Sequence, residues 1–155
     1  MQTNSAFERI GEHALTAMID DFVGRVTSDT MIGFFFRNFD HDRLRRHEYQ
    51  FTARALGARL AYEGQPLRTA HAKHPIMGGQ FNRRKTILHE TMVDHAFPDD
   101  VIHLLLQHTE QLRPLITAQP DSACITEQAG GPLLSSWAPQ QGESGESGKD
   151  GSADD

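Results

Sequence analysis

Histidines are the side chains of this sequence most able to do chemistry. The 155-residue chain contains nine of them and a single cysteine, Cys124. His71 and His74 lie three residues apart, just before Pro75 and a pair of glycines. Imidazole nitrogens bind metal ions and change charge near neutral pH. One cysteine forms no internal disulfide and supplies no thiolate cluster. The composition therefore directs attention to metal, cofactor or pH chemistry.

A zinc site at these histidines is disfavoured. Pro75 breaks the helix beside His71 and His74, and no cysteine or well-spaced carboxylate completes a tetrahedral set. The stretch HETMVDH, residues 89–95, also lacks H-E-x-x-H spacing. We interpret four further histidines as solvated or boundary residues: His13, His41, His103 and His108.

Two histidines are expected to point inward from different helices. His47 falls on the core-facing side of a predicted helix over residues 41–57, and His71 falls at the end of a short predicted helix over residues 66–72. A lone inward histidine is usually a core residue bonded to a backbone carbonyl. Two of them, beside an aromatic wall at residues 34–36 (FFF), favour a bound metal cofactor. Haem is the natural candidate, because it requires an apolar cavity with one or two imidazoles.

The elements that must position these side chains are all predicted to be helical. In residues 12–27 the apolar positions recur at steps of three and four, which indicates one buried helix face. Further helices are predicted over residues 41–57, 66–72, 81–94 and 99–117, and Asp40 offers an N-cap for the first of these. No segment alternates with a period of two, so we expect an all-α fold.

Size and composition indicate one domain. With 37% apolar residues, the chain can bury one core but is too short for two. It has no apolar run long enough to span a membrane, and its first residues, MQTNSAFERIGEH, lack the layout of a signal peptide. We therefore expect a cytoplasmic protein without a membrane partner. The net charge of −6 argues against non-specific nucleic-acid binding.

The chain changes character near Pro120. Residues 120–155 are rich in glycine, serine, proline and acidic side chains, and the last part cannot bury enough apolar area to order itself. We expect a folded domain over residues 1–119 and a low-complexity, disordered tail over residues 120–155. A small apolar island in the tail docks on the domain, lies loose or contacts a partner. It consists of Leu133, Leu134 and Trp137.

A series of short motifs resembles a known family. In order, they are FERIG, IDDFVGRVTSD, FFF, RLRRHEYQF, ALGARLAYEGQPLRTAH and FNRRKTILHETM. Their order and spacing over about residues 6–117 resemble those of truncated haemoglobins of the 2-on-2 globin type, close to group I. The resemblance implies a 2-on-2 helical sandwich that holds haem b.

The resemblance also implies residue roles. His71 matches the proximal histidine that binds the haem iron, which leaves His74 as a bystander. The other matched haem-contacting positions are Phe36, Leu44, Glu48, Phe51 and Phe81. His47 matches a position that either reaches a haem propionate or binds iron as a sixth ligand.

Two departures from the family pattern bear on ligand binding. The pair Phe22 and Val23 stands where the family usually has a phenylalanine and a tyrosine, so the hydroxyl that hydrogen-bonds iron-bound oxygen is absent. Glu48 can replace this hydroxyl as a hydrogen-bond donor only if it is protonated. Otherwise the side chain of Tyr49 or His47 would have to move toward the bound ligand. Each glycine-pair hinge keeps one glycine, which leaves room for a positive φ at each site.

The expected function is a haem globin that binds O2, NO or CO. Two-imidazole ligation would favour redox or nitric-oxide chemistry over oxygen storage, and nitric-oxide dioxygenation would need a reductase as electron donor. Two alternatives stay open: a haem sensor or interaction module that signals through the tail, and a globin fold that has lost haem. A monomer or weak homodimer is expected.

Overall fold

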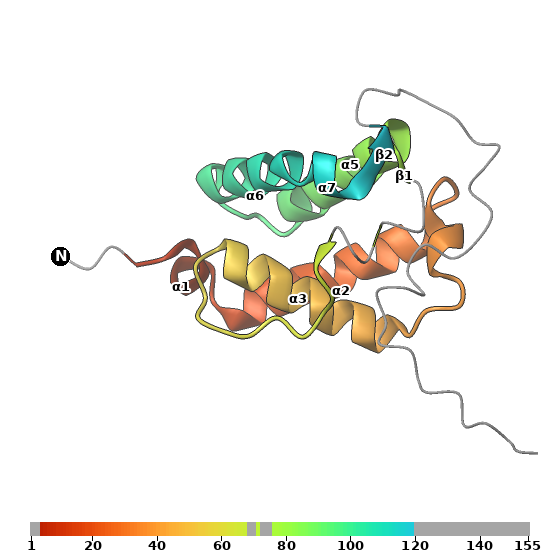
Figure 1. Ribbon diagram of the computed structural model, residues 1–155. Helices are drawn as coiled ribbons and strands as arrows, with labels where there is room; N and C mark the ends of the chain where they lie inside the picture. Colours follow the sequence, from red (N-terminus) through yellow and green to blue (C-terminus); the bar gives the residue numbers. More distant parts are fainter. Residues whose placement is uncertain (1–3, 68–70, 72–75, 120–155) are drawn as a thin grey trace, which may run out of the picture.

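The helices lie in two layers in the computed structural model, which describes residues 4–67, 71 and 76–119 (Figure 1). One layer contains α1 (Ala6–Ile10), α2 (Glu12–Ser28) and α3 (His41–Ala55), and the other contains α5 (Gly78–Asp94), α6 (Asp99–Gln111) and α7 (Arg113–Ile116). The short 3-10 helix η1 (Gly33–Phe36) connects α2 to α3. The prediction of an all-α fold is confirmed.

The first layer forms as the periodicity predicts. Six apolar side chains of α2 are buried on one face: Leu15, Met18, Ile19, Phe22, Val23 and Val26. The side chain of Asp40 caps α3 by accepting hydrogen bonds from the amides of Asp42 and Arg43. Gly11 and Gly57, the glycines retained from the two family glycine pairs, adopt φ values of 83° and 98°, so both sites use the positive φ for which the sequence leaves room.

Helix α5 begins three residues earlier than predicted. The expected start was Phe81, but the helix starts at Gly78, so the pair Gly78 and Gly79 belongs to its first turn. The side chain of Gln80 accepts a hydrogen bond from the Met77 amide at 3.0 Å. This local contact fixes the first turn of α5, and the spacing of apolar residues does not reveal it.

The helix predicted over residues 99–117 is divided. Helix α6 ends at Gln111 and α7 starts at Arg113, with Pro114 in its first turn. Proline has no amide hydrogen to donate to the preceding turn, so one continuous helix is disfavoured there. Two short strands pair in parallel: β1 (Ile76–Met77) and β2 (Thr117–Gln119). They are too short to show an alternation of apolar and polar residues in the sequence.

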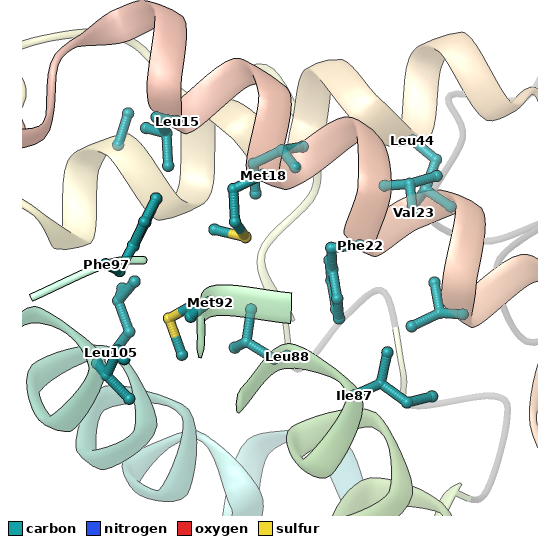
Figure 2. Packing of buried hydrophobic residues seen from close by; sticks show 14 of the residues in the cluster. Leu15, Met18, Phe22, Val23, Leu44, Ile87, Leu88, Met92, Phe97 and Leu105 are labelled. Atoms are coloured by element: carbon teal, nitrogen blue, oxygen red, sulfur yellow. The ribbon is translucent and has the colours of Figure 1, made fainter. Parts of the chain in front are cut away.

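The core fills the space between the two layers. Figure 2 shows Met18 and Phe22 of α2 on one side, and Leu88 and Met92 of α5 on the other. Leu105 of α6 joins the same cluster. Burying such side chains stabilises the fold by about 1.5–3 kcal/mol each. Within the described residues, no helix is long and apolar enough to cross a membrane.

Candidate functional site

A cavity lies next to this core, with about 960 Å³ of empty space that includes its solvent-open part. Its wall includes residues of helices α3, α5 and α6 and of η1, together with Leu67 and His71. Most lining side chains are apolar; the polar ones are Glu48, Thr52, His71, Gln80, Arg84 and Thr109. An apolar cavity with a few polar groups is typical of a cofactor or small-molecule site.

His71 is buried at the wall of this cavity. Its Nδ1 lies 2.7 Å from the carbonyl oxygen of Leu67, which also lines the cavity. A carbonyl only accepts hydrogen bonds, so Nδ1 must carry the proton. In the neutral ring the lone pair is then on Nε2, which is the state in which a histidine binds a metal. The local structure therefore prepares this imidazole to act as a ligand.

Most of the residues expected from sequence at the site share this cavity. Those that line it are Phe36, Glu48, Phe51, His71 and Phe81. Leu44 lies outside the lining and is buried in the hydrophobic core. In the predicted aromatic wall, Phe35 and Phe36 line the cavity and Phe34 does not. His74 lies outside the described residues.

His47 is buried on α3 but is not part of the cavity lining. Its ring lies edge-on to that of Tyr62, with the ring centroids 5.9 Å apart. Burial lowers the pKa of His47, and the nearby charges of Arg43 and Arg46 lower it further. The inward orientation predicted from the helix periodicity is confirmed, and the ring is biased toward its neutral form.

The structure adds a residue that the sequence did not single out, Arg84. Its Nη2 donates to Oε1 and Oε2 of Glu48 at 2.7 and 2.8 Å. The Glu48 side chain is 6% exposed and that of Arg84 is 29% exposed. The Arg84 guanidinium also lies over the ring of Phe22, 5.0 Å from its centroid. The two charged side chains of the cavity lining therefore form an ion pair in which the carboxylate is buried and the guanidinium is partly exposed.

A signal for Arg84 was present in the sequence. Phe81, Arg84 and Leu88 recur at steps of three and four, so the arginine shares a helix face with two apolar residues. A charged residue on such a face must be paired or must line a cavity. Arg84 does both.

Comparison with known proteins decides the family. Residues 5–118 match the profile of the bacterial-like globins. The chain belongs to this family. This globin is 28% identical over 113 residues to the group 1 truncated hemoglobin GlbN of Mycolicibacterium paratuberculosis, a match that covers 72% of this chain and 83% of the relative.

Solved structures of truncated globins share the fold of this globin. The Fe(III) form of truncated hemoglobin from Tetrahymena pyriformis superposes with a TM-score of 0.70 at 24% identity, over 75% of this chain and 100% of the other. The 2/2 hemoglobin from Synechococcus sp. PCC 7002, in the cyanomet state and with covalently attached heme, gives 0.67 at 22% identity, over the same shares of the two chains. The predicted truncated 2-on-2 globin fold is confirmed.

Membership of a globin family implies haem binding, and the cavity of this globin fits that group. In globins, haem sits in a largely apolar pocket and its iron is held by a histidine imidazole. The cavity wall supplies apolar side chains from several helices, together with the oriented His71.

Proposed function

We propose that this globin holds haem b through His71 and binds diatomic gases. The observation that carries the proposal is the hydrogen bond from His71 Nδ1 to the Leu67 carbonyl at the cavity wall. This bond fixes the tautomer and ring orientation and raises the basicity of Nε2. The bound haem supplies an iron to which O2, NO or CO can attach. Around it, Phe36, Phe51 and Phe81 keep water out.

If His47 leaves the sixth iron position open, the missing tyrosine hydroxyl at Val23 supports a preference for CO and NO over O2. Val23, at the position where the family usually carries a tyrosine, is fully buried in the core and offers no hydroxyl. Loss of one hydrogen bond to bound O2 costs on the order of 1–3 kcal/mol of ligand stabilisation. A redox or nitric-oxide-detoxifying role is consistent with this preference, and it requires a reductase as partner.

A second imidazole ligand is the alternative coordination. The spacing of His47 and His71 along the chain suits the family pattern in which a second histidine binds iron as a sixth ligand, and this supports the alternative. In the structure His47 packs against Tyr62, so ligation requires its ring to move into the cavity. External ligands would then have to displace that ring, which would gate their binding.

Absorption spectra of the purified full-length protein test the proposal. We expect a Soret band in the wild type and loss of bound haem in His71→Ala, while His103→Ala, which alters an exposed histidine of α6, keeps its haem. Unchanged haem content and spectrum in His71→Ala would refute the role of His71. Sharp, split visible bands of the ferrous wild type that merge in His47→Ala would establish two-imidazole ligation.

Other roles are separated by simple observations. A wild type that shows no Soret band after haem addition would be a globin fold acting by contact alone. A sensor that signals through residues 120–155, which lie outside the described residues, would change its ligand kinetics or partner binding when the tail is deleted. We propose that the protein functions in the cytoplasm. We also propose that it is a monomer or a weak homodimer.

A further inference from the structure

We propose that Arg84 enables the haem cavity to bind small inorganic monoanions in addition to neutral gases. The inference rests on the proposed haem-binding function. It adds a ligand class, and a residue that selects it, in the same cavity.

The hydrogen-bonding capacity of Arg84 exceeds what Glu48 uses. A guanidinium carries five N–H groups in a planar fork. Both bonds to Glu48 come from Nη2, and the described residues include no other acceptor bonded to Arg84. The N–H groups of Nε and Nη1 therefore remain for a further acceptor, and an anion is the best one, because charge-assisted hydrogen bonds are the stronger kind.

The position of Arg84 holds its charge inside the cavity. Its guanidinium lies against the face of Phe22, a buried core residue. The same helix face carries Phe81 and Leu88, which also line the cavity. The Arg84 side chain is 29% exposed, so its charge acts over an effective dielectric below that of water, and its attraction for an anion is stronger than in bulk solvent.

Glu48 opposes anion binding while it holds Arg84 in place. Its carboxylate neutralises the guanidinium and repels a second negative charge. Removing that charge should strengthen anion binding, and removing the guanidinium should weaken it. A neutral ligand such as CO should respond little to either change. This pattern of opposite signs distinguishes electrostatic selection from a simple change of pocket shape.

Azide titration of the ferric, haem-loaded, full-length protein tests the inference. We expect Arg84→Met to weaken azide binding by about tenfold or more, since a hydrogen bond to a charged group is lost. Glu48→Gln should tighten it several-fold. Lys85→Met removes the same charge from the adjacent position of α5, where the lysine pairs with Glu110, and should leave the dissociation constant within about twofold of the wild-type value.

The double variant Glu48→Gln/Arg84→Met protects the test against misfolding. It leaves no unpaired buried carboxylate, and it should bind azide as weakly as Arg84→Met or nearly so. CO binding to the ferrous forms serves as the neutral comparison. Azide affinity that is the same with and without Arg84, or CO affinity that falls in parallel, would overturn the inference but not haem binding. A wild type that takes up no haem would overturn both.

Discussion

Asp29, the C-cap of α2, accepts two hydrogen bonds from Arg83 of α5, a residue 54 positions later in the chain. Arg83 Nη2 and Nε lie 2.8 and 3.0 Å from Asp29 Oδ2, and the carboxylate is only 7% exposed. Asp29 Oδ1 accepts hydrogen bonds from the backbone amides of Met31 and Ile32. The Asp29 side chain therefore shapes the turn toward η1 and joins the two layers.

Replacing Asp29 by alanine should reduce the free energy of unfolding by about 3 kcal/mol, because Arg83 and two backbone amides lose a largely buried acceptor. Urea unfolding of the full chain at neutral pH measures this. Asp100→Ala breaks an exposed ion pair with Arg9 and should leave the midpoint unchanged. If both variants unfold at the same urea concentration, the carboxylate does not join the layers.

How much of the fold follows from sequence depends on where the determining contacts lie. The apolar residues of α2 repeat along a single helix face, and Asp40 caps the helix that directly follows it. Such short-range patterns can be recognised from the sequence alone. The start of α5 and the break before α7 also have local causes, the Gln80 side chain and Pro114, but neither cause is an apolar repeat. Helix ends were therefore misplaced although the helices themselves were predicted.

The site divides in the same way. His71 and Phe81 were predicted because their motifs keep the order and spacing of a family. The pairing of Glu48 with Arg84 joins positions 36 residues apart, and it depends on how α3 and α5 face each other across the cavity. Local periodicity could flag Arg84 as an inward charge, but it could not supply the partner.

Two glycines should respond oppositely to substitution by alanine. A Cβ at Gly33 would lie 2.8 Å from the backbone oxygen of Thr27, whereas one at Gly24 would meet nothing within 4 Å. Gly33→Ala should therefore destabilise the fold by about 1–3 kcal/mol. Gly24→Ala, inside α2, should stabilise it by about 0.5–1 kcal/mol. Thermal unfolding of the two variants beside the wild type measures both effects, and shifts of equal sign would contradict the packing described at Gly33.

Deletion of residues 120–155 should leave haem uptake and CO binding unchanged. The family profile ends at residue 118, and the Tetrahymena globin is fully covered by 75% of this chain. The deleted residues thus lie beyond the part of the chain that matches the globin profile. Haem titration and CO rebinding of the shortened and full-length proteins provide the measurement. A loss of haem affinity would show instead that the tail contributes to the cavity.

His108 on α6 should make the fold less stable in mild acid. Its ring lies 5.6 Å from that of Phe51, and burial lowers its pKa below the usual value. As the pH falls below the unfolded-state pKa of about 6.5, the unfolded chain takes up a proton that the folded one resists. The sign follows: the free energy of unfolding falls with pH until the folded-state pKa is passed, and recovers as the pH rises above 6.5 or so.

Urea unfolding between mildly acidic and mildly alkaline pH isolates this contribution when the wild type is compared with His108→Asn. The asparagine does not titrate, so the difference in stability between the two proteins should shift in favour of the variant as the pH falls. His47, whose pKa is also lowered, titrates in both proteins, and its contribution cancels in that difference. His103→Asn, at an exposed position of the same helix, should keep the pH dependence of the wild type. A constant difference between the wild type and His108→Asn would mean that the ring is as easily protonated in the folded chain as in the unfolded one, which its burial against Phe51 opposes.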